Sequence, residues 1–406
     1  MRYTIFLTIF LCAVFAHRSA AEDGFVSLFN GTDLTGWTVK GGDARFFVED
    51  GVIVGVVNDT RRNTFLCTEQ EFENFIFKVE FKYDQNFNSG IQFRSSARPD
   101  GDRERVYGYQ CEMEPRGMTA AIWDEARRNR WLNDVTDELR DKTQQNFKHG
   151  EWNELKIQCV GPSIRTWLNG ELITDIFDTM TTRGFFGLQV HASGSLGAQV
   201  RWRNIRIKEL PATPWIPFFQ DGQFVGLEVK PPGKWEFQED GSVHATTASA
   251  EQRDGLLFSR EMFDNFAVRV SFKRGQGNSG LYFRAHEVDA PYWLRGFRSA
   301  IRGDHRVGGL WEVRGGPSPG RGGVFMPPEE NAQNLRPEWN DFVVVAIGDR
   351  VVTNLNGMQI VDIIAPDSPK NGKTALRLQG GSDVEYWFRN FEIMPLSEEM
   401  AELIKR

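Results

Sequence analysis

Long apolar runs, cysteine and positive charge are all scarce in this sequence of 406 residues. Beyond residue 21 no apolar run approaches the roughly 18 residues that a membrane-spanning helix needs, so we expect no membrane span. The 48 lysines and arginines are outnumbered by 55 aspartates and glutamates. Because nucleic-acid binding requires a basic surface, this excess of acid argues against a nucleic-acid partner.

Only four cysteines occur. Cys12 lies in the N-terminal apolar stretch, which leaves Cys67, Cys111 and Cys159, an odd number that allows one disulfide at most. This count excludes a disulfide-rich scaffold. Cys111 alternates with Met113 and Cys159 with Ile157, a pattern that favours buried and unreactive thiols.

The N-terminal stretch has the pattern of an export signal. Arg2 is followed by the apolar run 5–15 and then by the small residues Ser19, Ala20 and Ala21. This order predicts a signal peptide over residues 1–21, with cleavage after Ala21. We therefore expect a protein exported to the periplasm or the extracellular space.

The remainder of the chain contains two copies of one pattern. Matched landmarks follow the same order in both halves: Asn88-Ser89-Gly90 with Asn278-Ser279-Gly280, Trp152-Asn153 with Trp339-Asn340, and Leu168-Asn169-Gly170 with Leu355-Asn356-Gly357. Two long copies indicate a domain duplication rather than a solenoid. Because residues 211–217 are rich in proline, we predict a first domain over 22–210 and a second over 211–406, the latter ending in a short helix.

Alternation of apolar and polar residues predicts the fold class. Phe77, Val79 and Phe81 alternate with charged residues, as in antiparallel strands with one buried face. Asn169-Gly170 is typical of a tight hairpin turn. The sequence therefore predicts an all-β protein of two tandem jelly-roll β-sandwiches. Trp152 and Trp339 begin corresponding strands, and we expect them to lie in the two cores.

Several motifs together resemble the 3-keto-disaccharide hydrolase domain family. They are Leu28-Phe29-Asn30-Gly31-Thr32 with Gly36-Trp37, Asn88-Ser89-Gly90-Ile91, Gly150-Glu151-Trp152-Asn153, Trp167-Leu168-Asn169-Gly170 and Gly187-Leu188-Gln189-Val190-His191. The resemblance covers nearly all of the first copy and, with departures, the second. It implies concanavalin A-like sandwiches whose concave face handles sugar, and it implies action on 3-ketoglycosides.

Polar side chains alternate with apolar ones on several strands of the first copy. Because residues i, i+2 and i+4 of a strand share a face, each of these sets projects to one side. If the strands adjoin in one sheet, its open face carries a sugar-binding inventory of carboxylates, amides, an imidazole, a guanidinium and an indole. The residues are Gln92 and Arg94, then Gln110, Glu112 and Glu114, then Trp167, and then Gln189 and His191.

We assign the chemistry among these residues as a hypothesis. His191, Glu112 and Glu114 are the candidate catalytic residues, because eliminating a substituent from a 3-keto sugar needs a base and an acid. Gln92, Arg94, Gln110, Gln189 and Trp167 are candidates for substrate binding. Arg94 has a counterpart in Arg284, which favours a structural role for it instead. Glu112, Glu114 and His191 could also hold a divalent metal, although the sequence has no compact metal motif.

The segment 124–147 interrupts the strand pattern. It is rich in charged residues and is expected to be a long excursion with one or two helical turns, a kind of insertion that often lies over a site. Asp124 and Arg128 would then contact the substrate from a rim loop. The alternative is that they belong to a charge-paired surface segment.

The second copy changes the site positions. In our alignment Glu112 and Glu114 are replaced by neutral or basic residues, and Gln189-Val190-His191 meets Gln379-Gly380-Gly381. We therefore predict that any chemistry belongs to the first copy and that the second is degenerate. The expected function is cleavage of a glycoside or oligosaccharide by an exported protein. The alternatives are a pair of carbohydrate-binding modules without catalysis and a purely structural or adhesive role.

Overall fold

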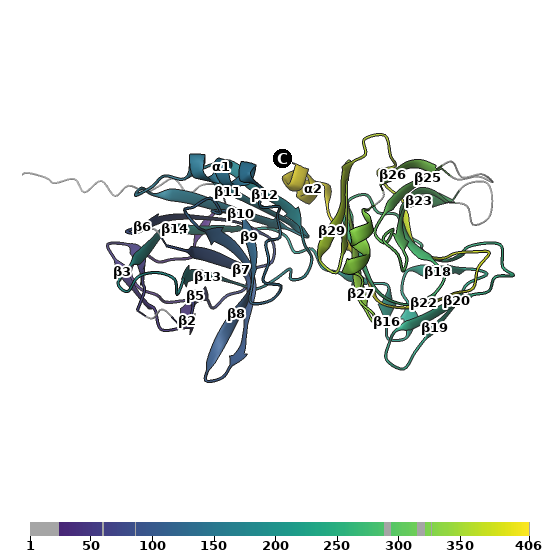
Figure 1. Cartoon of the computed structure of the whole chain (residues 1–406), viewed down its shortest axis with the longest axis horizontal. Helices are drawn as coiled ribbons and strands as arrows, with labels where there is room; N and C mark the ends of the chain where they lie inside the picture. The colour runs from purple at the N-terminus through teal and green to yellow at the C-terminus, as the bar shows by residue number, and fades with distance from the viewer. Residues whose placement is uncertain are drawn as a thin grey trace, which may run out of the picture.

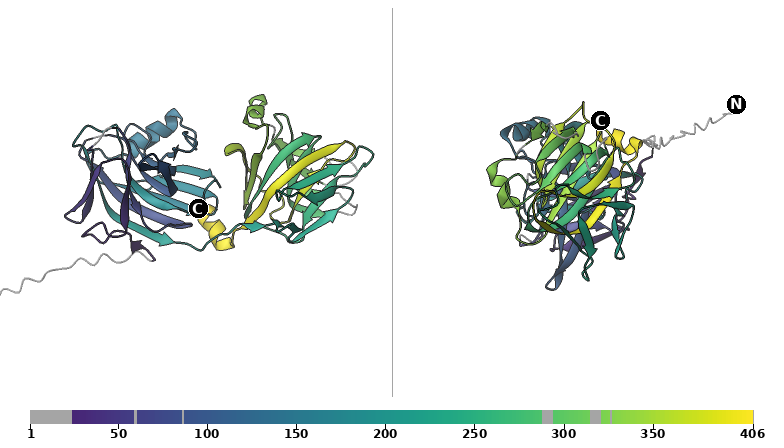
Figure 2. Two further views of the ribbon diagram at one scale, coloured as in Figure 1. Left: turned by 90° about the horizontal axis from the view of Figure 1, so that it is seen from below. Right: turned by 90° about the vertical axis from the view of Figure 1, so that its right-hand side faces the viewer.

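The chain folds into two β-sandwiches that follow one another along the long axis of the molecule (Figures 1 and 2). The computed structural model describes residues 24–58, 61–85, 87–287, 294–314, 321–325 and 327–405. The predicted signal peptide, residues 1–21, lies outside these ranges. Within them, no helix has both the length and the apolar character needed to cross a membrane.

The first sandwich consists of two antiparallel sheets. The larger sheet has the strand order β12 (Glu171–Phe177), β11 (Ser163–Leu168), β10 (Asn153–Val160), β6 (Phe75–Tyr83), β14 (Gln199–Glu209), β4 (Val52–Val56) and β3 (Arg45–Glu49), with β1 (Val26–Ser27) paired to β14. The smaller sheet has the order β2 (Trp37–Gly41), β5 (Thr64–Thr68), β13 (Phe185–Val190), β7 (Ser89–Asp100), β8 (Arg103–Met113) and β9 (Ile122–Glu125).

The second sandwich repeats this arrangement. Its larger sheet has the order β19 (Lys234–Phe237), β20 (Val243–Thr247), β31 (Val384–Pro395), β22 (Phe266–Gln276), β27 (Asn340–Ile347), β28 (Arg350–Leu355) and β29 (Met358–Ile364), with β15 (Ile216–Pro217) paired to β31. Its smaller sheet has the order β18 (Leu227–Lys230), β21 (Gly255–Ser259), β30 (Lys373–Leu378), β23 (Ser279–Glu287), β24 (Leu294–Ile301), β25 (Leu310–Arg314) and β26 (Arg321–Phe325). A small hairpin joins β16 (Phe219–Gln220) to β17 (Gln223–Phe224).

The prediction of two tandem concanavalin A-like jelly-roll sandwiches is confirmed. In β6, Phe77, Val79 and Phe81 are buried in the core, while the charged residues between them are half-buried on the outer face. Each such apolar side chain contributes roughly 1.5–3 kcal/mol when it is fully removed from water. The predicted hairpin joins β11 to β12, with Asn169 and Gly170 at φ values of 50° and 90°.

The predicted burial of the cysteines is also confirmed. Cys67, Cys111 and Cys159 are free and buried. Burial raises the pKa of Cys159 to about 11, which keeps its thiol protonated at neutral pH.

The expectation that Trp152 and Trp339 lie in the cores is wrong. Both are half-buried, and the guanidinium groups of Arg203 and Arg389 each lie 4.0 Å from the centre of the respective indole ring. Since successive side chains of a strand point to opposite faces, it is the following residue, Asn153, that turns inward and is buried.

The segment 124–147 is more regular than expected. Its first residues belong to strand β9, and helix α1 (Asp137–Asn146) spans ten residues, or about three turns rather than one or two. The hydroxyl of Thr136 caps this helix by accepting the backbone N–H of Leu139 at 3.1 Å.

The two sandwiches are joined by an apolar cluster and by the C-terminal helix α2 (Glu398–Lys405), which lies between them (Figure 1). A short 3₁₀ helix, η1 (Glu329–Asn334), precedes β27. Val160 and Phe177 of the first sandwich pack in the same cluster as Met394 and Met400 of the second. The side-chain amide of Gln158 donates to the carbonyl of Leu403 in α2 at 2.9 Å.

Candidate functional site

Four polar side chains lie together on the outer face of the smaller sheet of the first sandwich. They are Gln189 on β13, Gln92 on β7, and Gln110 and Glu112 on β8. Strand register aligns them, because Gln92 pairs with Gln110 and Gly90 pairs with Glu112. All four are buried, although their apolar neighbours Ile91, Cys111 and Leu188 face the core instead. We call this set, with the residues bonded to it, the polar face.

Hydrogen bonds connect the polar face from strand to strand. Gln92 Nε2 donates to Gln110 Oε1 at 2.6 Å, and Gln110 Nε2 donates to Glu112 Oε2 at 3.1 Å and to Gln189 Oε1 at 3.3 Å. The Gln110 side chain crosses β7 at Gly90, where a Cβ atom would lie 2.6 Å from Gln110 Nε2. Glycine at this position therefore makes the bond between Gln110 and Gln189 sterically possible.

Glu112 is a buried carboxyl group with an altered acidity. Burial raises the pKa of Glu112 from its ordinary value of 4.5 to about 8, and the nearby carboxylates of Glu125 and Glu114 act in the same direction. Hydrogen bonds from Asn88 and Gln110 oppose this rise, and the bond from Asn88 Nδ2 to Glu112 Oε1 is 2.6 Å long. Glu112 therefore holds a proton at neutral pH.

Glu125 supplies the second carboxyl group of the polar face, a residue that the sequence analysis missed. Glu125 and Trp123 alternate on β9, and Trp123 pairs with Gln110. Burial raises the pKa of Glu125, while the charge of Arg105 and side-chain hydrogen bonds with Trp123 and Asn63 lower it. The signal for both residues was the alternation in Ile122-Trp123-Asp124-Glu125. It was interrupted in the prediction because the irregular excursion was expected to begin at Asp124.

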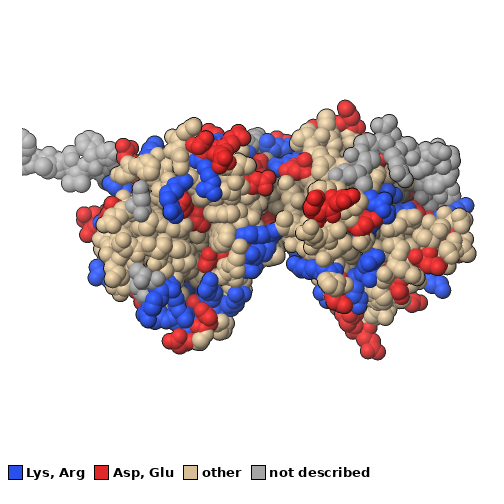
Figure 3. Space-filling model, viewed as in Figure 1, with Lys and Arg blue, Asp and Glu red and all other residues tan. Residues whose placement is uncertain are grey.

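The end of the hairpin between β7 and β8 is tied to β2, because Lys40 Nζ binds the Glu104 carboxylate at 2.7 Å. A cavity of about 190 Å³ lies there, lined by Phe65, Asn63, Arg105, Val106 and Glu125 among others. Figure 3 shows both basic and acidic side chains at the end of the first sandwich where this hairpin projects. The polar face meets this cavity through Glu125, and the charged lining is balanced, with Arg61, Arg62 and Arg105 against Asp100, Glu104 and Glu125.

His191 follows β13 directly and is half-buried. Its Nδ1 lies 2.7 Å from the hydroxyl oxygen of Ser193 and accepts the backbone N–H of Ser193 at 2.9 Å. Burial lowers the pKa of His191, which favours the neutral imidazole at neutral pH. His191 follows Gln189 by two residues at the end of β13, and Asn88, the residue that binds Glu112, immediately precedes the neighbouring strand β7.

Glu114 is held away from Glu112 by its own partners. Its carboxylate accepts the backbone N–H of Arg116 at 3.2 Å and the Nε–H of the same residue at 2.5 Å, in the turn that follows β8. Among the described residues, no three His, Cys, Asp or Glu side chains are grouped so that they could hold a metal ion. The hypothetical metal set of Glu112, Glu114 and His191 is therefore not formed.

The expectation that Arg94 shares a face with Gln92 is wrong, because a β-bulge follows Phe93. Arg94 has a φ of 44° and is buried, and its guanidinium donates to the carbonyls of Glu73 and Gly161 and to Asn74 Oδ1 at 2.7 to 3.0 Å. Arg284 repeats this geometry in the second sandwich with a φ of 47°. Arg94 is a structural residue at the end of the sandwich, although its partners are backbone carbonyls and Asn74 rather than Glu112 or Glu114, the partners expected for a structural arginine.

Trp167 also lies outside the polar face, because β11 belongs to the larger sheet. It pairs with Lys156 on the outer surface of that sheet, and the ammonium of Lys156 lies 3.5 Å from the centre of the indole ring. Trp123 is the indole that borders the polar face in its place.

Asp124 and Arg128 belong to a buried ion-pair network. Asp124 accepts from Arg127 Nε at 2.8 Å and from Arg128 Nε, and Arg128 Nη1 binds Asp178 at 2.7 Å. Tyr109 completes the network by donating its hydroxyl to Asp178. The charges are paired as the alternative reading predicted, but the network is buried rather than on the surface.

The second sandwich retains the strands of the polar face and replaces its side chains. In the first sandwich, Gly90 pairs with Glu112 on one side and lies beside Gln189 on the other. In the second, the corresponding Gly280 pairs with Ala300 on one side and with Arg377 on the other. This register aligns Gln189 with Arg377 and His191 with Gln379, which corrects our sequence alignment by two residues. The second copy has neither the carboxyl group nor the imidazole at these positions.

Together the paired sheets define a protein of two tandem concanavalin A-like β-sandwich domains. Residues 24–208 and 214–394 each match the model of the 3-keto-alpha-glucoside-1,2-lyase-like domain. The chain therefore belongs to this family and contains two tandem copies of its domain, which confirms the resemblance seen in the sequence. The comparison with curated proteins gave no match.

Solved structures of similar fold cover one sandwich at a time. A candidate glycosyl hydrolase from Parabacteroides distasonis is 22% identical, with a TM-score of 0.34, and the match covers 46% of this chain and 94% of that one. The carbohydrate-binding module CBM66 from Bacillus subtilis is 17% identical, with a TM-score of 0.32, over 45% of this chain and 100% of that one. A protein with a galectin-like fold from Bacillus subtilis is 12% identical, with a TM-score of 0.28, over 42% and 89%.

Proposed function

We propose that the first sandwich cleaves glycosides whose sugar is oxidised at C3, with Glu112 as the acid and His191 as the base. Membership of the 3-keto-alpha-glucoside-1,2-lyase-like family supports this substrate class. The observation that carries the proposal is the raised pKa of Glu112, about 8, on the sheet face of Gln189, the residue two positions before His191, whose pKa is lowered. Environments that separate two titratable groups in this way are typical of acid–base pairs.

The two residues suit the chemistry of a 3-keto sugar. The ketone acidifies the proton on C2, and His191 takes that proton at Nδ1, the unprotonated nitrogen of its neutral ring, which gives up its hydrogen bond from the N–H of Ser193. The electron pair left on C2 forms a double bond to C1 as the bond from C1 to the glycosidic oxygen breaks. The carboxyl group of Glu112 donates its proton to the departing oxygen. General acid–base catalysis of this kind contributes roughly 10²- to 10⁴-fold to the rate.

A second candidate function is binding of carbohydrate without cleavage. The observation that favours it is the hydrogen-bonded row of amides formed by Gln92, Gln110 and Gln189. Ordered amides beside the indole of Trp123 would suit the hydroxyl groups and the C–H face of a sugar ring.

Turnover and binding assays separate the two candidates. The mature chain is incubated with a 3-keto-glucoside and, separately, with the same glucoside unoxidised. The proposal expects cleavage of the oxidised substrate only, with losses of about 10²-fold or more in Glu112→Gln and His191→Ala. Saturable binding of either sugar by the wild-type chain without any cleavage would instead establish the binding function.

We also propose that the protein is exported by the signal peptide over residues 1–21. The arginine, the apolar run and the small residues before position 22 support this proposal. Sequencing the N-terminus of the protein purified from its own cells tests it: a mature chain beginning at Glu22 is expected, and an intact Met1 would contradict it.

A further inference from the structure

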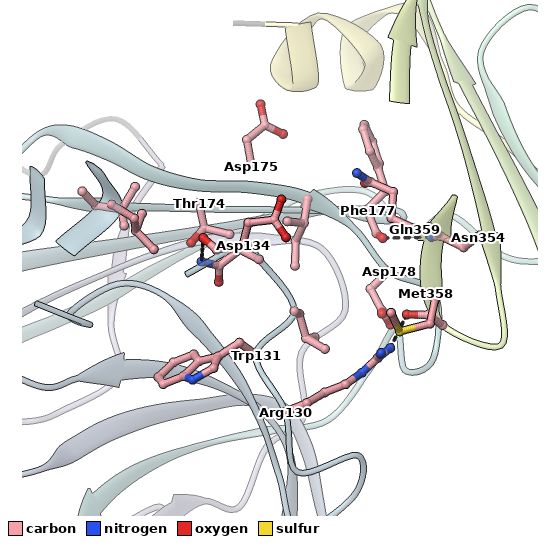
Figure 4. A pocket seen from close by; sticks show the side chains of 16 residues that line it. Arg130, Trp131, Asp134, Thr174, Asp175, Phe177, Asp178, Asn354, Met358 and Gln359 are labelled. Atoms are coloured by element: carbon pink, nitrogen blue, oxygen red, sulfur yellow. Dashed lines mark hydrogen bonds between the residues drawn. The ribbon is translucent and has the colours of Figure 1, made fainter. Parts of the chain in front are cut away.

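A second cavity, of about 390 Å³, lies between the two sandwiches and shares no lining residue with the polar face (Figure 4). The segment 130–134 and strand β12 line it from the first sandwich, and the hairpin of β28 and β29 lines it from the second. This volume falls within the roughly 300–1,000 Å³ of small-molecule sites. We call it the interdomain cavity.

Two hydrogen bonds fix the walls of this cavity. Arg130 Nη2 donates to the carbonyl of Gly357 at 2.5 Å, and Asn354 Nδ2 donates to the carbonyl of Phe177 at 3.1 Å. Both bonds cross from one sandwich to the other. They hold the turn of the second sandwich against the first, so the cavity is a formed feature of the domain junction.

The same two side chains present unused polar atoms. Among the described residues, neither Arg130 Nε nor Asn354 Oδ1 has a hydrogen-bond partner, and both atoms are buried. One is a donor and the other an acceptor, and each unsatisfied buried group costs roughly 1–3 kcal/mol. A ligand with hydroxyl groups would satisfy both, because a hydroxyl both donates and accepts.

The charges around the cavity balance. Ion pairs of 2.9 Å and 2.7 Å neutralise Asp175 and Asp178 with arginines next to the cavity. The remaining lining charges are one carboxylate and one guanidinium. When the ion-pair partners outside the lining are counted as well, five carboxylates face five guanidinium groups: Asp124, Asp134, Asp175, Asp178 and Asp362 with Arg127, Arg128, Arg130, Arg165 and Arg350. Because these charges cancel, the cavity favours a neutral ligand over an anion or a cation.

Trp131 adds an aromatic wall. It is half-buried and meets the ring of Trp123 edge to face, with ring centres 5.1 Å apart and an angle of 69° between the planes. Figure 4 shows the indole of Trp131 and the side chain of Arg130 on the side of the first sandwich, opposite Asn354 and Met358. An aromatic ring among convergent polar groups is the common arrangement for binding the C–H face of a sugar.

We propose that the interdomain cavity is a second saccharide-binding site, which takes a neutral saccharide of one or two rings. Trp131 would contact the sugar ring, and Arg130, Asn354 and Gln359 would bind its hydroxyl groups. The site is independent of the cleavage proposed for the polar face. It also gives the segment 124–147 a role, since residues 130–134 of that segment form one wall of the cavity.

Calorimetric titration of the mature chain carrying Glu112→Gln tests the proposal, because this background removes the proposed turnover. Maltose, cellobiose, lactose and sucrose are the probes. Trp131→Ala and Gln359→Ala are the test variants; Trp131 is half-exposed and Gln359 exposed, so both variants are expected to fold. Trp152→Ala is the matched control, because Trp152 is equally half-buried and does not line the cavity.

The expected result is saturable binding of at least one probe, weakened tenfold or more by Trp131→Ala and by Gln359→Ala and unchanged by Trp152→Ala. Binding of none of the four probes would overturn the proposal, and so would binding that both test variants leave intact. Failure of the cleavage proposal is seen separately, as absence of turnover in the chain with Glu112 intact.

Discussion

Asn88 donates its side-chain N–H to Glu112 over 2.6 Å, while its own Oδ1 is buried without a hydrogen-bond partner among the described residues. The bond stabilises the charged form of Glu112 and so lowers the pKa of a carboxyl group that burial has raised. Asn88 thereby tunes the acidity of the group that we propose as the catalytic acid.

Removing this bond is expected to shift the pH profile of cleavage. In Asn88→Ala the pKa of Glu112 rises further, so the protonated acid persists to higher pH. The alkaline limb of the rate profile therefore moves to higher pH. Steady-state rates of 3-keto-glucoside cleavage across the alkaline range measure the shift. Asn278→Ala, at the corresponding position of the second sandwich, is the control and should leave the limb in place.

Stability should depend on pH through Glu112. Because the folded-state pKa is about 8 and the ordinary value is 4.5, the native state holds a proton that the unfolded chain loses between these values. The contribution of Glu112 to the free energy of unfolding is therefore greatest below pH 4.5 and falls by about 1.4 kcal/mol per pH unit as pH rises toward 8. Urea unfolding of the wild type and of Glu112→Gln across this pH range measures the contribution of Glu112. The same pH dependence of the unfolding free energy in both chains would refute the prediction.

Arg94 and Arg284 should matter for stability and not for substrate affinity. Replacing either by methionine leaves buried carbonyls without a donor, at a cost of roughly 1–3 kcal/mol for each such group. Both variants are expected to unfold at lower urea concentration. If the Arg94→Met chain kept its stability but had a raised KM, Arg94 would instead be a substrate-binding residue.

Trp123 rather than Trp167 should affect the use of substrate. Trp123 pairs with Gln110 in the sheet of the polar face, whereas Trp167 lies on the outer surface of the other sheet. Trp123→Ala is expected to raise KM about tenfold, equivalent to ~1.4 kcal/mol of binding. Trp167→Ala should leave KM unchanged, and the opposite pattern would show that the sugar binds elsewhere.

Alternation along strands predicted much of the polar face. Gln92, Gln110, Glu112 and Gln189 share a face because each lies in a regular stretch of strand, where a period of two holds. Arg94 does not follow this period because a bulge after Phe93 turns the Arg94 side chain away from the face of Gln92. A bulge of this kind leaves no periodic signal in the sequence.

Other features depended on tertiary pairing. The choice of Trp167 failed because alternation shows which residues share a face of one strand but not which sheet that strand joins. Glu125 was missed because β9 is short and its charged neighbours resemble a loop. The raised pKa of Glu112 also could not be read from the sequence, since it results from burial beneath other segments.

The protonation state of Glu112 is the most direct test of the proposed chemistry. Carbon-13 NMR of the mature chain, with labelled glutamate side chains and Glu112→Gln to assign the signal, follows its titration. The proposal predicts a midpoint near pH 8. A midpoint near the ordinary 4.5 would mean that Glu112 is ionised at neutral pH, and it could not then be the acid that protonates the leaving group.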